Sequence, residues 1–102
     1  MILAELDKLE RYLKSHGYIC VRVDDTTPEH MERHQIIVYD LEDDIAEDVR
    51  AWDAVCHPGS YGYEKGLLEV MGSAVVRVYN DEVEGYLTAQ DIINRLEEND
   101  EN

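Results

Sequence analysis

The sequence has no phenylalanine, only two cysteines and only two prolines among 102 residues. Seven tyrosines and one tryptophan supply the aromatic bulk, so a core built from them needs partners for buried hydroxyl and indole N–H groups. The two thiols, Cys20 and Cys56, are too few for the disulfide framework of a small secreted domain. This scarcity favours a protein whose thiols stay reduced.

Long apolar runs are also absent. The first segment, MILAELDKLERYLK, carries a charge every few residues and has no apolar region of the kind found in signal peptides. No stretch approaches the roughly 18 apolar residues that cross a bilayer. We therefore expect a cytoplasmic protein.

Basic residues are scarce as well. Nine lysines and arginines face 24 aspartates and glutamates, which gives a net charge of −15 at pH 7. Binding to phosphate backbones and to anionic lipids depends on lysine and arginine, so we expect no direct contact with nucleic acid or with a membrane. The same electrostatics steers the chain toward basic protein surfaces. A more modest interpretation is that the acidity only keeps a small protein in solution.

The apolar pattern predicts one α+β domain over residues 1–98, followed by a disordered acidic tail at 99–102. Leu6, Leu9 and Leu13 recur at helical spacing and predict a helix over 3–16. Three β-branched or alternating segments predict strands at 18–24, 34–40 and 51–57. Their short connections favour an antiparallel meander.

The acidic segment LEDDIAEDVR separates the second and third of these strands. Leu41, Ile45 and Val49 recur every four residues, which predicts a short exposed helix inserted in a hairpin. An irregular acidic loop is the alternative.

The second half is less regular. The segment EKGLLEVMG (64–72) predicts a short helix after a glycine-rich turn, and residues 73–79 predict a fourth strand, with a helical extension as the alternative. Residues 80–85 predict a turn. Thr88 and Asp91 resemble a capping box, which predicts a last helix over 89–98.

The resulting order is α-β-β-β-α-(β)-α, an antiparallel sheet of three to four strands with helices packed on one face. The first five elements resemble the order of a double-stranded-RNA-binding domain. That module reads phosphates with basic residues at its second helix, where this chain offers Glu64 and a single Lys65. The resemblance implies a topology and no function.

The cysteines, histidines and carboxylates do not form the pattern of a catalytic or metal site. Cys56 and His57 are neighbours on a predicted strand and point to opposite faces, so Cys56 is interpreted as a small core residue rather than a nucleophile. His30 and His34 have an H-x₃-H interval, but no paired cysteines accompany them as in a structural zinc site. No two of the 24 carboxylates stand out as an acid/base pair. We therefore predict no catalytic residue, metal or cofactor, and a protein that is not an enzyme.

Two surfaces remain as candidate partner-binding sites. One is a set of acidic clusters at strand ends and in the second connection: Asp24, Asp25, Asp40, Glu42, Asp43, Asp44, Glu47 and Asp48. Carboxylates spaced in this way can approximate the charge array of a nucleic-acid backbone. The other is the tyrosine-rich loop at 58–63, with Tyr61 and Tyr63, because tyrosine is favoured at interface hot spots. A homodimer formed through this loop is one version of the second hypothesis.

The block AWDAVCHPGSYGYEKGLLEVMG, followed by EGYLTAQDII, resembles a block found in small proteins of bacterial phages and mobile elements. In size and acidity the chain also resembles phage-encoded anti-CRISPR and DNA-mimic inhibitors. These resemblances imply an inhibitor in the bacterial host cell, with a basic nucleic-acid-binding protein or nuclease as its partner. The sharpest version is an anti-CRISPR protein that acts on a Cas nuclease.

Overall fold

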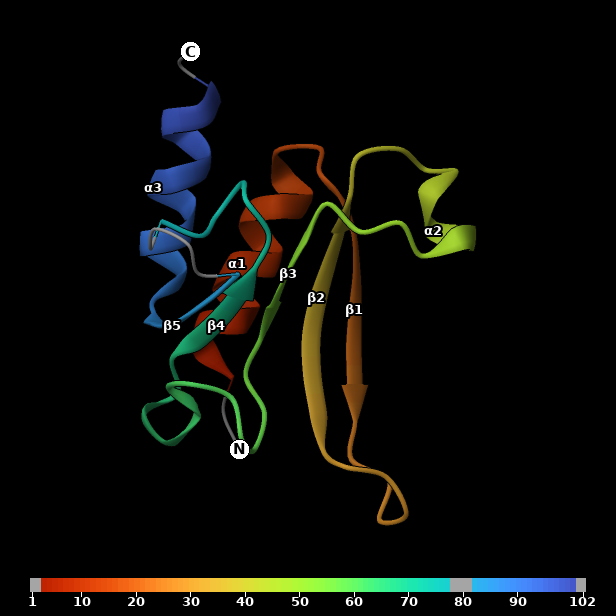
Figure 1. Ribbon diagram of the computed structural model, residues 1–102, viewed down its shortest axis with the longest axis vertical. Helices are drawn as coiled ribbons and strands as arrows, with labels where there is room; N and C mark the ends of the chain where they lie inside the picture. Colours follow the sequence, from red (N-terminus) through yellow and green to blue (C-terminus); the bar gives the residue numbers. More distant parts are fainter. Residues whose placement is uncertain (1–2, 78–81, 101–102) are drawn as a thin grey trace.

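Figure 1 shows the computed structural model, which describes residues 3–77 and 82–100. Five antiparallel strands pair strictly in chain order, so the sheet is a simple meander. The strands are β1 (Ile19–Asp25), β2 (Arg33–Tyr39), β3 (Trp52–Val55), β4 (Leu68–Met71) and β5 (Val83–Leu87). The predicted α+β class is confirmed, and the sheet has one strand more than the three or four expected.

Two helices of twelve residues each cover one face of the sheet (Figure 1). In α1 (Ala4–Ser15), Leu6, Leu9 and Leu13 are buried, as their spacing predicts. Both helices contribute to a single core cluster, together with the helix-facing side chains of β2, β3 and β4. Burying each large aliphatic side chain contributes about 1.5–3 kcal/mol, which makes this layer the main source of stability.

The second long helix, α3 (Ala89–Asp100), begins at the capping box that the sequence predicts. The Asp91 N–H donates to Thr88 Oγ1 at 3.1 Å, and the Thr88 N–H donates to the Asp91 carboxylate at 2.9 Å. The helix continues two residues past its expected end at 98. The Asn99 side-chain amide donates to the Ala74 carbonyl at 2.9 Å, while residues 101–102 of the expected tail lie outside the described residues.

The helix predicted at 64–72 was wrong. Gly62 and Gly66 both have positive φ angles, 99° and 71°, which confines helical structure to a short 3-10 turn, η1 (Tyr63–Lys65). Leu68 and Val70 then point into the core and alternate with Glu69, so this segment is strand β4. The fifth element is therefore not a helix, and the order shared with double-stranded-RNA-binding domains is not found.

The next two predictions were also wrong where the structure describes them. Residues 73–75 form a turn and residues 76–77 have no regular structure, because the N–H groups of Val75 and Val76 both donate to the Gly72 carbonyl. The expected turn at 80–85 overlaps β5, which starts at Val83. Residues 78–81 lie outside the described residues.

An ion pair fastens α3 to β5. Arg95 donates to both oxygens of Glu84 at 2.8 Å, and it also donates to the Val75 carbonyl at 2.7 Å. Both charged side chains are more than four-fifths buried. The hydrogen bonds from Arg95 lower the pKa of Glu84 despite its burial.

We expect Glu84→Gln to lower the free energy of unfolding by about 1–3 kcal/mol, because Arg95 then loses its charged partner while remaining largely buried. Urea denaturation measures this change. The matched control is Glu82→Gln, which removes an exposed carboxylate of the same type and is expected to change stability by less than about 0.5 kcal/mol. Equal losses in the two variants would contradict a structural role for the pair.

Candidate functional site

The segment from Asp40 to Arg50, here called the 40–50 connection, projects from the end of the sheet between β2 and β3 (Figure 1). It contains the one-turn helix α2 (Asp44–Glu47). Of the two alternatives for this segment, the short helix is therefore correct, although it is only four residues long.

The base of the connection is fixed to the sheet by Asp48. Its Oδ1 accepts a hydrogen bond from the Tyr39 hydroxyl at 2.8 Å, and its two oxygens accept from Arg50 at 2.9 and 3.0 Å. These hydrogen bonds, from Arg50 first and then from Tyr39, lower the pKa of the Asp48 carboxyl. Asp48 also ends α2 in a left-handed conformation, which aspartate tolerates better than most residues. Its role is thus structural.

The other predicted carboxylates of the connection fall into two groups, one half-buried residue and four exposed ones. Asp44 is half-buried and accepts a hydrogen bond from the Leu41 N–H at 3.2 Å. Four are exposed and form no hydrogen bond or ion pair with any residue that the structure describes: Asp40, Glu42, Asp43 and Glu47. These four are the carboxylates of the connection that remain free to interact with solvent.

Apolar side chains lie among these carboxylates. Leu41 is 63% exposed, Val49 is 54% exposed and Ile45 is 41% exposed. Three large apolar residues in solvent within nine positions are unusual for a chain whose other aliphatic residues mostly reach the core. The four-residue spacing that predicted a helical stripe therefore marks a solvent-facing apolar set rather than a face packed on the sheet.

Asp24 and Asp25 lie elsewhere. They end β1, whose start pairs with the end of β2, so they are separated from Asp40 by the length of a seven-residue strand. At 3.3–3.4 Å per residue that length is about 20 Å. The predicted acidic residues therefore form two groups at opposite ends of the β1–β2 pair and not one continuous array.

Asp24 belongs to an internal network. Its Oδ1 lies 2.8 Å from His34 Nδ1, and it also accepts from Arg22, which bridges to α1 through Asp7 and Glu10. Burial raises the pKa of Asp24, but the hydrogen bonds from His34 and Arg22 outweigh that effect and lower it overall. This carboxylate is used to join α1 to the sheet.

Asp25 is also engaged within the chain. Its Oδ1 accepts from the Thr27 N–H at 3.0 Å, and its Oδ2 lies 3.0 Å from His30 Nδ1. The hydrogen bonds from Thr27 and then from His30 lower the pKa of Asp25 to about 2.

We expect an NMR titration of the Asp25 side-chain carbon to give a pKa of about 2. The folded-state pKa is then below the unfolded value of about 3.9, so the stabilisation is complete above pH ~4 and is lost as the pH falls toward 2. Thr27→Val keeps the backbone N–H, removes the hydroxyl and should raise this pKa partway toward its usual value. An unshifted Asp25 in the wild-type chain would show that its carboxylate is free to face a partner.

The tyrosine-rich loop packs against β5. Tyr61 is 61% exposed and lies over Gly85, where a Cβ atom would come within 2.2 Å of the Tyr61 Cβ. Tyr86, with a positive φ of 61°, is 59% exposed and lines the same hollow of about 350 Å³ as Tyr61. Sequence reasoning missed Tyr86, because the residue lies in a segment interpreted as following a turn.

Tyr63 differs from Tyr61. It is half-buried and packs against the core cluster. Burial and the nearby carboxylate of Glu32 raise the pKa of its hydroxyl. Of the two predicted tyrosines, Tyr61 is therefore the one presented to solvent, and Tyr86 is its neighbour.

Cysteine and histidine chemistry finds no support in the geometry. Cys56 is 1% exposed and burial raises the pKa of its thiol, as expected for a core residue. His34 lies in β2, and each of its two ring nitrogens is within 2.9 Å of a carboxylate, Nδ1 of Asp24 and Nε2 of Glu32. Within residues 3–77 and 82–100, no group of three or more His, Cys, Asp or Glu side chains could hold a metal ion.

Comparison of the chain with protein-family models, with curated proteins and with solved structures finds no match. Among the described residues, no helix combines the length and the apolar character required to cross a bilayer. The function therefore has to be inferred from the geometry of the chain itself.

Proposed function

We propose that this chain is a non-enzymatic inhibitor that docks the 40–50 connection on a basic, nucleic-acid-binding surface of a partner in the host-cell cytoplasm. The observation that carries the proposal is the combination of four exposed carboxylates with exposed Leu41, Ile45 and Val49 on one projecting segment. Carboxylates steer a basic partner, and apolar side chains supply contact area that survives physiological salt.

A net charge of −15 supports the same kind of partner. Long-range attraction to a basic groove raises the rate of association, and it opposes binding to phosphate. A surface evolved for nucleic acid is basic and accessible, so an acidic segment seated there excludes the nucleic acid by competition. An anti-CRISPR protein that acts on a Cas nuclease is the sharpest form of this proposal.

The decisive variant replaces Glu42, Asp43 and Glu47 together by Gln, Asn and Gln. These residues are exposed, and Asp44 and Asp48 are left unchanged because they fix the connection internally. We expect DNA cleavage by a susceptible, RNA-guided Cas nuclease to need at least about tenfold more of this variant than of wild-type chain for half inhibition at about 0.15 M salt.

The matched control makes the same change in net charge elsewhere, at exposed Glu29, Glu64 and Glu97. We expect this control to inhibit almost as well as the wild-type chain, within about threefold. Equal weakening of both variants would indicate a diffuse charge effect. Full inhibition by the first variant would contradict the role of the 40–50 connection.

A second candidate function is a protein-interaction or homodimerising module that uses the tyrosine-rich loop. The observation in its favour is that Tyr61 and Tyr86 are both exposed beside one hollow. A tyrosine anchor buries a large area at low entropic cost and depends little on salt.

Sedimentation of the wild-type chain at several concentrations tests the homodimer. If this loop forms the interface, we expect a dimer that Tyr61→Ala combined with Tyr86→Ala converts to a monomer at both low and high salt. The control is Met31→Ala, which changes a strongly exposed residue outside the loop. Another tyrosine such as Tyr12 would not serve, because Tyr12 packs on the core. A monomeric wild-type chain would contradict this version.

A further inference from the structure

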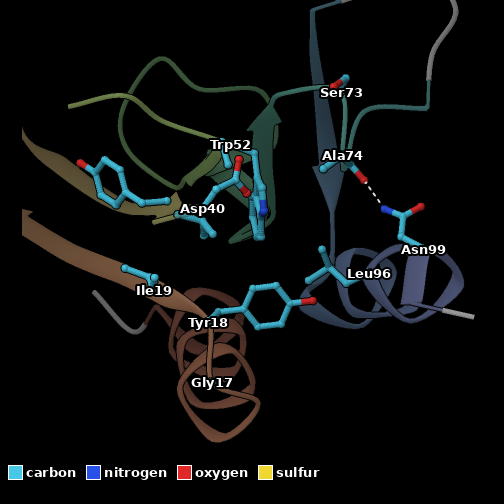
Figure 2. A pocket seen from close by; sticks show the side chains of 12 residues that line it. Gly17, Tyr18, Ile19, Asp40, Trp52, Ser73, Ala74, Leu96 and Asn99 are labelled. Carbon is cyan, nitrogen blue, oxygen red and sulfur yellow. Dashed lines mark hydrogen bonds between the residues drawn. The ribbon is translucent and has the colours of Figure 1, made fainter. Parts of the chain in front are cut away.

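A hollow of about 480 Å³ opens next to the root of the 40–50 connection (Figure 2). One wall comes from the start of β1, the end of β2 and the start of β3, with Ile19, Asp40 and Trp52. The other comes from the turn after β4 and from α3, with Ala74 and Leu96. The hollow is thus continuous with the candidate site through Asp40.

The wall of the hollow contains an indole N–H that has no acceptor in the described part of the chain. Trp52 is only 4% exposed, and its indole lines the hollow (Figure 2). No acceptor in the described part of the chain takes a hydrogen bond from its Nε1–H. The indole N–H can only donate, and it opens on the hollow, since His57 Nδ1 is the one buried side-chain N or O atom without a partner among the described residues. An occupant that displaces water from the hollow therefore has to supply an acceptor. An acceptor brought in by a ligand would satisfy this group.

Charge in the hollow has one sign. Asp40 is the only charged residue among those that line it, and its carboxylate forms no bond with a described residue. Ser73 and Asn99 are the polar residues on the opposite wall, and Asn99 already donates to the Ala74 carbonyl and accepts from Arg77. The rest of the lining near Trp52 is apolar or aromatic, including Tyr18, Val38 and Leu96. A suitable occupant is therefore a cation with an apolar stem.

We propose that this hollow receives one arginine side chain of a partner protein. The methylene stem lies against the apolar wall, the guanidinium pairs with Asp40 and stacks near the indole, and the arginine's own backbone carbonyl accepts from Trp52 Nε1. An anionic group is excluded by Asp40, and a purely apolar occupant would leave the indole N–H unsatisfied. The inference rests on the proposed function only in taking the partner surface as basic.

Trp52 is the only tryptophan of the chain, so its indole N–H gives a single NMR resonance that reports directly on the hollow. The probes are N-acetyl-arginine N-methylamide, its lysine counterpart and its citrulline counterpart, which keeps the shape of arginine without the charge. We expect the arginine probe to shift the Trp52 resonance saturably and to bind about tenfold more tightly than the citrulline probe. A resonance that does not move, or equal binding of the citrulline or lysine probe, would overturn the inference.

Two variants and one control variant locate the binding. Asp40→Asn should weaken the arginine probe about tenfold, whereas Asp43→Asn, which removes an exposed carboxylate outside the hollow, should weaken it less than about twofold. Ser73→Leu fills the hollow from an exposed position without changing the charge and should also abolish the shift. A thermal melt confirms that each variant is folded. Equal effects of the two aspartate changes would show diffuse attraction and contradict the inference.

The experiment separates this inference from the proposed function. The variant at Glu42, Asp43 and Glu47 leaves Asp40 and the hollow intact, so it should bind the arginine probe within about threefold of wild type. If that variant inhibits the nuclease fully while Asp40→Asn still loses the probe, the proposed function fails and the arginine site stands. If the triple variant loses inhibition while Asp40→Asn still binds the arginine probe as tightly as wild type, the proposed function stands and the arginine site fails.

Discussion

The architecture depends on a few arginines, because the chain has nine cations to set against 24 carboxylates. Arg22 joins β1 to α1, Arg95 joins α3 to β5, and Arg50 ties the 40–50 connection to its own base at Asp48. The contacts of Arg22 and Arg95 each lie where a helix meets a strand. A planar guanidinium can bind several carboxylate oxygens at once, so three arginines fasten the helices and the connection. Several of the remaining carboxylates form no ion pair with a described residue and face solvent, among them Asp40, Glu42, Asp43 and Glu47.

Because cations are few, the sequence alone could not show which acidic residues are paired within the fold and which face solvent. A list of aspartates and glutamates does not show that Asp24 accepts from Arg22 and lies against His34, or that Asp48 accepts from Tyr39. Those contacts join residues up to ten positions apart, and the Asp24–His34 contact exists only after β1 and β2 have paired. The separation of Asp25 from Asp40 is a simpler matter, since an antiparallel pair places the end of one strand beside the start of the next.

The fold was predictable where a pattern was long and where its caps were local. The leucines of α1 span two turns, and the Thr88–Asp91 box marks the start of α3 within four residues. Residues 67–71 carry too short a pattern, because Leu67, Leu68 and Met71 suit a helix while Leu68 and Val70 suit a strand. Pairing with β3 and β5 decides in favour of the strand. Likewise, β5 requires Gly85 to let Tyr61 approach, which nothing near Gly85 in the sequence reveals.

The hollow beside Asp40 was equally hidden, since its walls come from β1, β2, β3, the turn after β4 and α3. Its place next to the 40–50 connection matters physically. Exposed carboxylates attract many basic surfaces, mostly through the rate of encounter, and salt weakens all such encounters alike. To discriminate between basic partners, the chain needs a contact that is favourable with one chemical group and unfavourable with others. In the proposed arginine site, Asp40 and the indole N–H of Trp52 line one hollow and would meet that requirement, and Leu41, Ile45 and Val49 would add contact area that salt does not screen. The two proposals thus assign steering and selection to adjacent parts of the same end of the molecule.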